Sequence, residues 1–424
     1  MSYTRCLRGL ASGIEYAADQ LMNLDPADGR PVEMVLDVER LMTELPDLGW
    51  YHPDRNDMWR FGALLPLDIE DPDDRQYIVS LGEGHTPELN YSDHPLAKQV
   101  GFRLSVKEEG RAVPGWGSNP TQSFKDRGMA MVVAMARKLG LKKLAVPTQG
   151  NAGDSLASYA VAAGLEVAIA MPDDTPMPIL GKVAGYAKLY PEQVHLDVVK
   201  GTIREAGALV KEKYLRDGFF SVATFQEPGW RIEGKKTMGL ELAEPKSPGD
   251  PWKLPDVILY PTGGGTGILG MWKAFEELEA LGLIAPDRPR IVSVQSEATA
   301  PIVRAFESGA SDTTAVEPGS TIAVGLNVSG GVGHFKVLEI VYESKGCAVA
   351  VSEEAIADAL RSTFVARGWW IGSEGAACLA ALEPLIDRGV IQSGDHVVAF
   401  NTGSAEKYLP ELRHLLVNEY GRSQ

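Results

Sequence analysis

The feature that most constrains the fold is a repeated alternation, from about residue 101 onward, of short β-rich runs with longer helical patterns. A strand, a Gly-rich turn and a helix, repeated this often, are typical of parallel α/β sheets. Several of the helices end at a Gly, which can adopt the left-handed conformation that stops a helix. The predicted pairs of strand and helix are 102–106 with 123–140, 143–147 with 151–164, 167–172 with 178–190, 257–261 with 267–282, 291–295 with 301–309, and 396–400 with 405–416.

The length of the chain and its first 80 residues suggest how it is divided. At 424 residues the chain exceeds one typical domain, so two domains that share a cleft are expected. The segment before about residue 81 is acidic, is interrupted by Pro and has a helical period near residues 35–45. We interpret this segment as an N-terminal extension.

Charge and cysteine usage limit the partners and the compartment. With 57 acidic and 41 basic residues the net charge is −16, which repels a phosphate backbone and argues against nucleic acid as a partner. The three cysteines are odd in number and far apart, so a reducing compartment is expected. The chain starts without the apolar core of a signal peptide and has no run of about 18 apolar residues. We therefore expect a cytoplasmic protein that has no membrane partner.

The first of three candidate loops, residues 123–128, carries a lysine at the start of a predicted helix. The positive end of the helix dipole lies there, and Asp126 offsets its repulsion of a cation. The dipole and the neighbouring Arg127 favour the neutral amine of Lys125, which is the form that a Schiff-base lysine requires. The alternative is a solvated surface lysine in a capped helix.

The second candidate loop follows the apolar strand 257–261 and opens the helix after it. Its glycines allow backbone N–H groups to turn toward an anion, and the helix N-terminus points at the same place. It is not a P-loop, because no Gly-Lys-Ser/Thr ends it, and it is not the dinucleotide fingerprint, because Ile268 replaces the last Gly. The pattern predicts a phosphate cradle formed by Gly263, Gly264, Gly265, Thr266 and Gly267.

The third candidate loop, residues 148–153, opens the predicted helix 151–164. Its backbone amides and the Thr148 hydroxyl could hold a carboxylate, and Asn151 could donate to a phenolic oxygen. The competing interpretation is a helix start capped by Asn151. Taken singly, each of the three loops is explained equally well as a tight turn.

In this order, the three loops resemble the threonine synthase family of fold-type II pyridoxal-phosphate enzymes. The family's run Asn-Pro-Thr-Gly-Ser-Phe-Lys-Asp-Arg-Gly reads here as residues 119–128, with Gln122 in place of the first Gly. The resemblance spans residues 81–408 and implies two open twisted parallel-sheet domains of α/β class, with pyridoxal phosphate in the cleft between them. Its further motifs are GEGHTP at 82–87, RIEGKKT at 231–237, SEGAA at 373–377 and NTGS at 401–404.

The resemblance also implies a domain division and an assembly. Residues 1–80 form the extension, with a degenerate zinc-ribbon-like start and a helix. Residues 81–128 and 225–424 form the large cofactor-binding domain, and residues 129–224 form the small domain. A homodimer that acts on a small amino-acid substrate is expected.

Site roles are implied by the same resemblance. Lys125 holds the cofactor as a Schiff base and moves protons at the substrate carbons, while residues 263–267 bind the cofactor phosphate. The Thr402 hydroxyl meets the pyridine nitrogen and, unlike a carboxylate, does not hold it protonated, which favours elimination over transamination. The remaining roles are Asn151 at the pyridoxal hydroxyl and Thr148, Gln149 and Gly150 at the substrate carboxylate.

The chain departs from the family pattern at the metal and at the substrate phosphate. Only Cys6 remains of two Cys pairs, so a tetrahedral zinc site is not expected and no metal is predicted. Glu227 stands where the family has a phosphate-binding Asn, and Ala208 where it often has an Arg, with Arg204 as a possible substitute. Lys235 and Lys236 are interpreted as a solvated pair on a helix.

Three functions remain open at this stage. The first is a carbon–oxygen lyase reaction that converts O-phospho-L-homoserine to L-threonine and phosphate. The second is a β-eliminating ammonia-lyase that acts on threonine, serine or diaminopropionate, because such substrates need no second anion site. The third is a regulatory protein that binds pyridoxal phosphate without catalysis.

Overall fold

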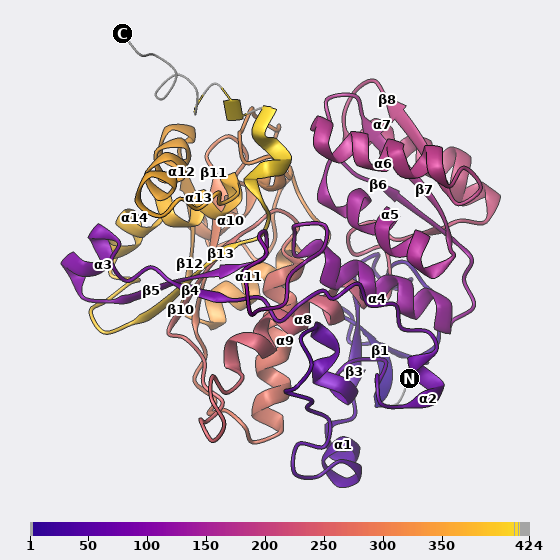
Figure 1. Ribbon diagram of the computed structural model, residues 1–424, viewed down its shortest axis with the longest axis horizontal. Helices are drawn as coiled ribbons and strands as arrows, with labels where there is room; N and C mark the ends of the chain where they lie inside the picture. Colours follow the sequence, from indigo (N-terminus) through magenta and orange to yellow (C-terminus); the bar gives the residue numbers. More distant parts are fainter. Residues whose placement is uncertain (1–2, 411, 414, 416–424) are drawn as a thin grey trace. The chain divides into compact units, whose positions relative to one another are not determined.

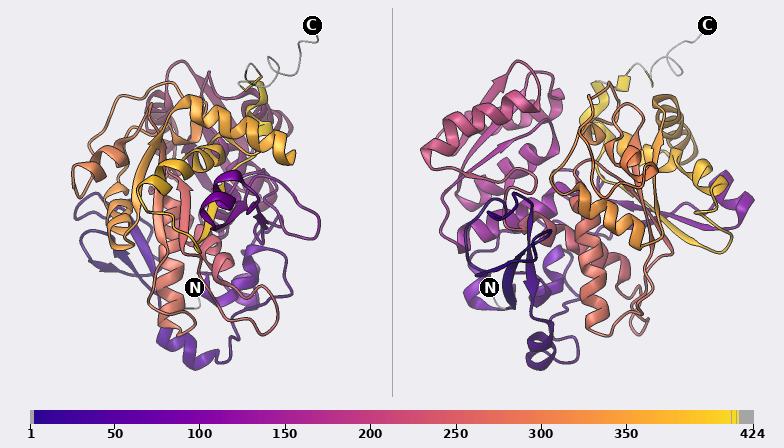
Figure 2. Two further views of the ribbon diagram at one scale, coloured as in Figure 1. Left: turned by 90° about the vertical axis from the view of Figure 1, so that its left-hand side faces the viewer. Right: turned by 180° about the vertical axis from the view of Figure 1, so that it is seen from behind.

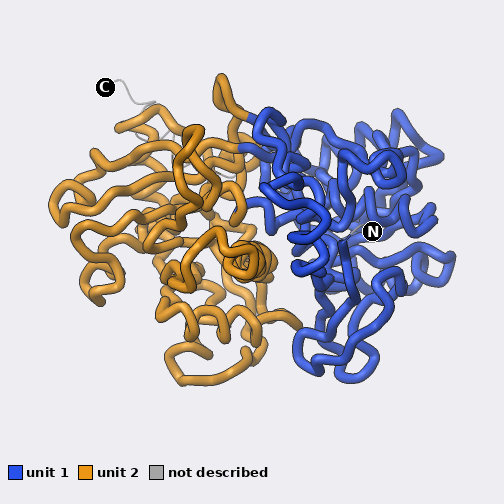
Figure 3. The backbone as a smooth tube through the Cα atoms, turned by 90° about the horizontal axis from the view of Figure 1, so that it is seen from below, with its two compact units in different colours: residues 1–85, 117–238 blue, residues 86–116, 239–424 orange. Residues whose placement is uncertain are grey.

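The computed structural model describes residues 3–410, 412–413 and 415 of the chain (Figures 1 and 2). It divides into two compact units (Figure 3). Unit 1 contains Met1–His85 and Gly117–Met238, and unit 2 contains Thr86–Trp116 and Gly239–Gln424. The last boundary falls within helix α8 (Trp230–Ala243). The domain division expected from the sequence stays a prediction, and its final residues, from 416, lie outside the described part.

Unit 1 begins with a small antiparallel sheet of order β2-β1-β3. Its Asp25 is 1% exposed and accepts hydrogen bonds from Ser12 Oγ and Tyr16 Oη, both at 2.5 Å. This carboxylate therefore connects the turns of the small sheet by hydrogen bonds. The expected helix at 35–45 is partly wrong, because residues 35 and 36 continue a strand and the Asp37 side chain caps the helix that follows. The elements are β1 (Thr4–Gly9), β2 (Glu15–Tyr16), β3 (Val32–Leu36), α1 (Val38–Glu44), the 3-10 segment η1 (Met58–Leu64) and α2 (Pro72–Arg75).

The rest of unit 1 is an α/β layer around a four-stranded parallel sheet of order β8-β7-β6-β9. Helices α5, α6 and α7 pack against its strands, and α4 packs against α5. The predicted pairs at 143–164 and 167–190 are confirmed. The elements are α4 (Lys125–Lys138), β6 (Lys143–Pro147), α5 (Asn151–Ala163), β7 (Glu166–Pro172), α6 (Met177–Leu189), β8 (Val194–Val199), α7 (Ile203–Leu209), η2 (Val210–Tyr214), η3 (Leu215–Asp217) and β9 (Phe220–Ser221).

Unit 2 is built on a six-stranded sheet of order β12-β11-β10-β13-β5-β4, parallel except for β4 at its edge. Helices α10, α11 and α13 pack on this sheet. Its first elements are β4 (Glu88–Asn90), α3 (Pro95–Val100), β5 (Arg103–Glu108), β10 (Val257–Pro261), α9 (Thr266–Ala280), β11 (Arg290–Ser296) and α10 (Pro301–Glu307). They are followed by η4 (Val324–Leu326), α11 (His334–Glu343), β12 (Cys347–Val351), α12 (Glu353–Arg367), α13 (Ser373–Ala380), α14 (Leu382–Asp387), β13 (His396–Asn401) and η5 (Ala405–Tyr408).

The parallel α/β class predicted from the alternation is confirmed. The glycines at 140, 164, 282 and 309, which end predicted helices, all have positive φ angles of 69–75°. The sequence pattern did not identify β8 or β12, because neither is followed by a Gly-rich turn that opens a long helix. The last predicted helix begins instead as the 3-10 turn η5, and its residues 411, 414 and 416 lie outside the described part.

The described residues show neither a metal cluster nor a membrane-spanning helix. No group of three or more His, Cys, Asp or Glu side chains among them is placed to hold a metal ion. No helix in the described ranges has the length and the apolar character required to cross a bilayer.

Candidate active site

Lys125 is the first residue of helix α4, as the sequence predicts, and no side chain caps this helix start. The neighbouring Asp126 is fully buried, and its role is not limited to offsetting the repulsion between the helix dipole and Lys125. It accepts hydrogen bonds from the Thr121 N–H at 2.7 Å, from Thr121 Oγ1 at 2.6 Å and, on helix α5, from Ser155 Oγ at 2.6 Å. Asp126 therefore fixes the loop before Lys125 to helix α5.

The same contact brings two predicted cofactor residues together. Ser155 lies one helical turn after Asn151, which is the first residue of α5, and Asp126 follows Lys125 directly. Since α4 packs against α5 and the Asp126–Ser155 bond joins their first turns, Lys125 and Asn151 begin neighbouring helices. The structure thus places both residues in unit 1 at one end of this helix pair.

The carboxylate loop lies at the carboxyl end of β6, where parallel sheets commonly bind ligands. Thr148 is 5% exposed, and its Oγ1 lies 3.2 Å from both the N–H and the carbonyl of Gly150. Gln149 Nε2 donates to Asp174 Oδ1 at 3.1 Å, so its amide is turned to a neighbouring acid. The loop therefore offers backbone groups and one hydroxyl for a carboxylate.

Gln122 has a φ of +60°, a left-handed conformation that favours Gly. The family pattern has Gly at this position, and the positive φ explains why. A Gln residue is strained at the same φ.

We expect Gln122→Gly to raise the free energy of unfolding by about 0.5–1 kcal/mol, after the greater chain entropy of Gly is deducted. Urea denaturation measures this, with Gln193→Gly as a control that should destabilise. A destabilised Gln122→Gly protein would contradict the strain argument.

The glycine loop occupies the turn from β10 to α9 in unit 2. Gly265 has a φ of +85°, and a Cβ there would lie 2.3 Å from Val337 Cγ2, so no larger residue fits. Within the described part of the chain, the N–H groups of Gly263, Gly264, Gly265 and Gly267 donate no hydrogen bond. Such clustered donors at a helix N-terminus fit a phosphate group.

His334, which sequence reasoning did not identify, holds this loop. Its Nε2 lies 2.9 Å from the carbonyl oxygen of Gly263, and its Nδ1 lies 3.1 Å from Thr313 Oγ1. Burial lowers the pKa of His334, so the ring is neutral near pH 7. Because a carbonyl only accepts, Nε2 carries the proton. The sequence feature that could have pointed to His334 is the Gly-rich run directly before it.

Thr402 follows β13, which pairs in parallel with β10. The carboxyl ends of these two adjacent strands therefore bring Thr402 and the glycine loop to the same edge of the sheet. Thr402 is 6% exposed. Unit 2 thus groups the residues predicted for the cofactor phosphate and for the pyridine nitrogen.

Glu227, at the position of the family's phosphate-binding Asn, and Arg204, the possible substitute for its Arg, lie in different surroundings. Arg204 is exposed on α7, where its backbone N–H donates to Thr202 Oγ1 at 3.2 Å in a capping box. Glu227 is 1% exposed, and its Oε2 accepts the Arg231 N–H at 3.2 Å at the start of α8. Burial raises the pKa of Glu227 to about 7.

The interpretation of Lys235 and Lys236 as a solvated pair is wrong. They are 1% and 0% exposed. Lys236 Nζ donates to the Leu64 carbonyl at 2.6 Å and pairs with Glu233. Single-sequence patterns could not find this, since charged residues on a helix are usually solvated.

Comparisons with known proteins show which proteins the chain is similar to. The family model described as pyridoxal-phosphate dependent enzyme matches residues 79–403. A threonine synthase from Methanosarcina acetivorans is 32% identical over 406 residues, which are 94% of this chain and 91% of that protein. A threonine synthase from Methanocaldococcus jannaschii is 32% identical over 82% of this chain and 80% of its own length. A fungal L-serine ammonia-lyase from Rhizomucor miehei has a similar fold, with a TM-score of 0.63, 19% identity, and coverage of 78% of this chain and 97% of that one.

Proposed function

Since the chain belongs to the pyridoxal-phosphate-dependent enzyme family and, within it, to the threonine synthases, we propose that it converts O-phospho-L-homoserine and water to L-threonine and phosphate. The observation that carries this proposal is the 32% identity to a threonine synthase over 94% of the chain. Lys125 at the start of α4 and the N–H groups of the loop at 263–267 support it. The reaction class is that of a carbon–oxygen lyase.

The residues present fit pyridoxal phosphate in both units. In unit 2 the donors of residues 263–267 would hold its phosphate, and Thr402 would meet the pyridine nitrogen. In unit 1 Lys125 would bind it through an imine, and Asn151 would donate to its hydroxyl oxygen. When bound, the cofactor supplies an electron sink for the carbanions of the substrate.

The other steps fall to the chain's own residues. Thr148, Gln149 and Gly150 would orient the substrate through its carboxylate. Lys125 would take the α-proton and then relay protons at the β-carbon. Phosphate leaves from the γ-carbon with its bonding electron pair, the γ-carbon receives the proton taken from the β-carbon and becomes the methyl group, and water adds at the β-carbon. A cytoplasmic location and a homodimer are further parts of this proposal, which cell fractionation and sedimentation would check.

The buried Glu227 favours a second candidate, a β-eliminating ammonia-lyase for threonine, serine or diaminopropionate. Above its pKa of about 7, a Glu227 carboxylate near the distal end of the substrate would disfavour a phosphate ester by several kcal/mol, on the order of the interaction of partly buried charges. Amino acids without a second anion avoid this repulsion. The same residues at Lys125 and at the glycine loop would serve either reaction.

One set of assays separates the candidates. The purified enzyme is incubated with O-phospho-L-homoserine, and free phosphate and threonine are measured together. Equal amounts of both products, absent with Lys125→Ala, support threonine synthase. Release of ammonia and a keto acid from threonine, serine or diaminopropionate, with no threonine formed from the ester, supports the ammonia-lyase. If the protein binds the cofactor but turns over none of these substrates, the result supports the third hypothesis, a regulatory protein without catalysis.

A further inference from the structure

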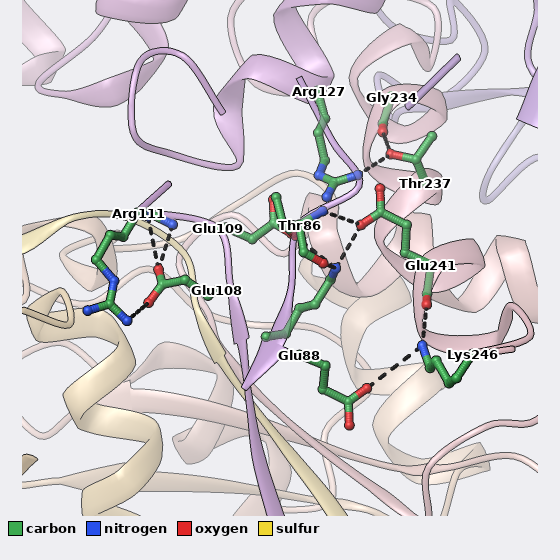
Figure 4. A network of polar contacts seen from close by, with 12 residues as sticks. Thr86, Glu88, Glu108, Glu109, Arg111, Arg127, Gly234, Thr237, Glu241 and Lys246 are labelled. Carbon is green, nitrogen blue, oxygen red and sulfur yellow. Dashed lines mark hydrogen bonds and ion pairs between the residues drawn. The ribbon is translucent and has the colours of Figure 1, made fainter. Parts of the chain in front are cut away.

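A buried carboxyl group at the end of β5 connects separate segments of unit 2. Glu108 is the last residue of β5 and is fully buried. Its Oε1 accepts hydrogen bonds from the N–H groups of Gly110 at 2.9 Å and Arg111 at 3.1 Å, and from Asn401 Nδ2 at 2.6 Å. Glu108 and Arg111 are labelled in Figure 4. One oxygen atom therefore joins the residues directly after β5 to Asn401, the last residue of β13.

The Asn401 side chain continues this connection to a third segment. Its Oδ1 accepts the Gly372 N–H at 2.9 Å, directly before helix α13. Asn401 is fully buried, and the residue after it is Thr402. Because the donor and the acceptor atom of this amide each have a partner, the Asn401 side chain is held in one orientation.

The backbone around Thr402 is packed so closely that two neighbouring positions have no space for a side chain. A Cβ on Gly110 would lie 2.3 Å from the carbonyl carbon of Gly403. A Cβ on Gly372 would lie 2.5 Å from the carbonyl oxygen of Gly403. The segments that are joined through Glu108 and Asn401 therefore also contact the residue directly after Thr402.

The Thr402 hydroxyl depends on this backbone for its position. Within the described ranges, Thr402 Oγ1 makes no hydrogen bond, although the residue is buried. A threonine hydroxyl has only a few staggered positions about one side-chain bond, so the backbone decides where the oxygen lies. A shift of residues 401–403 would move the atom that is proposed to meet the pyridine nitrogen.

This arrangement does not depend on the protonation state of Glu108. Burial raises the pKa of Glu108 to about 7, and the Arg111 guanidinium, with Nη2 at 3.7 Å from Oε2, opposes the shift. A proton on Oε2 leaves Oε1 as a carbonyl oxygen, which still accepts the same N–H groups. The connection thus requires an acceptor at Oε1 and not a charge.

We infer that Glu108 is a positioning residue for the cofactor: its Oε1, through Asn401 and the residues after β5, fixes the backbone at 401–403 and so places the Thr402 hydroxyl for the pyridine nitrogen. Glu108 acts through Thr402 and not by direct contact. The inference rests on the proposed function, in which Thr402 meets that nitrogen.

The test is a double-variant cycle in which equilibrium dialysis measures the dissociation constant of pyridoxal phosphate. Glu108→Ala and Thr402→Val should each weaken binding about tenfold, the effect of losing one hydrogen bond. The double variant should bind as weakly as either single variant, because Glu108 has nothing to position once the hydroxyl is absent. Independent roles would instead multiply the two losses to about a hundredfold.

Two further variants separate the proposed role from a general effect on stability. Glu108→Gln keeps an acceptor oxygen and should restore the dissociation constant to within about twofold of the unaltered protein. Glu88→Ala is the matched control, since Glu88 is a partly buried carboxylate of the same sheet whose Oε1 lies 2.8 Å from His396 Nε2. His396 begins β13, at the opposite end from Asn401, so this control should leave cofactor binding unchanged.

The inference is overturned by multiplied losses in the double variant, by unchanged binding in Glu108→Ala or Thr402→Val, or by an equal loss in Glu108→Gln. If Glu108→Ala fails to fold, Asn401→Ala removes the same connection from its other side and replaces it in the cycle, where multiplied losses or unchanged binding have the same meaning.

These measurements use no amino-acid substrate. Failure of the proposed reaction would appear separately, as the absence of product from O-phospho-L-homoserine in a protein that binds the cofactor. An unaltered protein that does not bind pyridoxal phosphate would overturn both the inference and the proposed function.

Discussion

Lys125→Ala is expected to abolish covalent attachment of pyridoxal phosphate and to reduce turnover by at least about 10⁴-fold, because one amine serves as imine former and as proton carrier. The donors of the glycine loop remain, so the variant should still bind the cofactor without a covalent bond. Borohydride reduction followed by peptide mass spectrometry measures the attachment. In the unaltered protein the reduced cofactor should be found on Lys125.

Lys142→Ala is the matched control, since Lys142 is exposed shortly after the same helix. It should keep both the covalent attachment and the activity. Reduced cofactor on another lysine, or normal turnover by Lys125→Ala, would contradict the assignment of Lys125.

Lys107→Met is expected to lower the free energy of unfolding of unit 2 by about 3–5 kcal/mol, the usual effect of removing one partner from a buried ion pair. Lys107 is 2% exposed on β5, and its Nζ donates to Glu241 Oε2 at 2.7 Å and to the Thr86 carbonyl at 2.5 Å. Thr86, Glu109 and Glu241 of this network are labelled in Figure 4. Glu109 Oε1 lies 4.0 Å from the same amine and accepts Thr86 Oγ1 at 2.6 Å. Methionine would leave two buried carboxylates without their cation.

Denaturant titration measures this loss of stability. Lys246→Met is the matched control, because Lys246 belongs to the same network but its side chain is 54% exposed. It should cost less than about 1 kcal/mol. An equal loss for both lysines would show that burial of the Lys107 pair is not the cause.

The alternation of strands and helices was sufficient for the fold class, because each apolar run and each Gly turn is a local property of the chain. The helix-ending glycines and the turn from β10 to α9 were found for the same reason. The third strand of the extension, β3, was misread at residues 35 and 36, since a short amphipathic stretch fits either a strand or a helix until its partner strand is known.

The sequence by itself determined the parallel α/β class, the three loops at strand ends and the lysine at the start of α4. Only the tertiary structure decided that Glu108 is joined to Asn401, that His334 holds the glycine loop and that Lys107 lies between two carboxylates. Each of these contacts joins segments far apart in the chain. Burial and charge pairing depend on which segments pack together, and no local pattern carries that information.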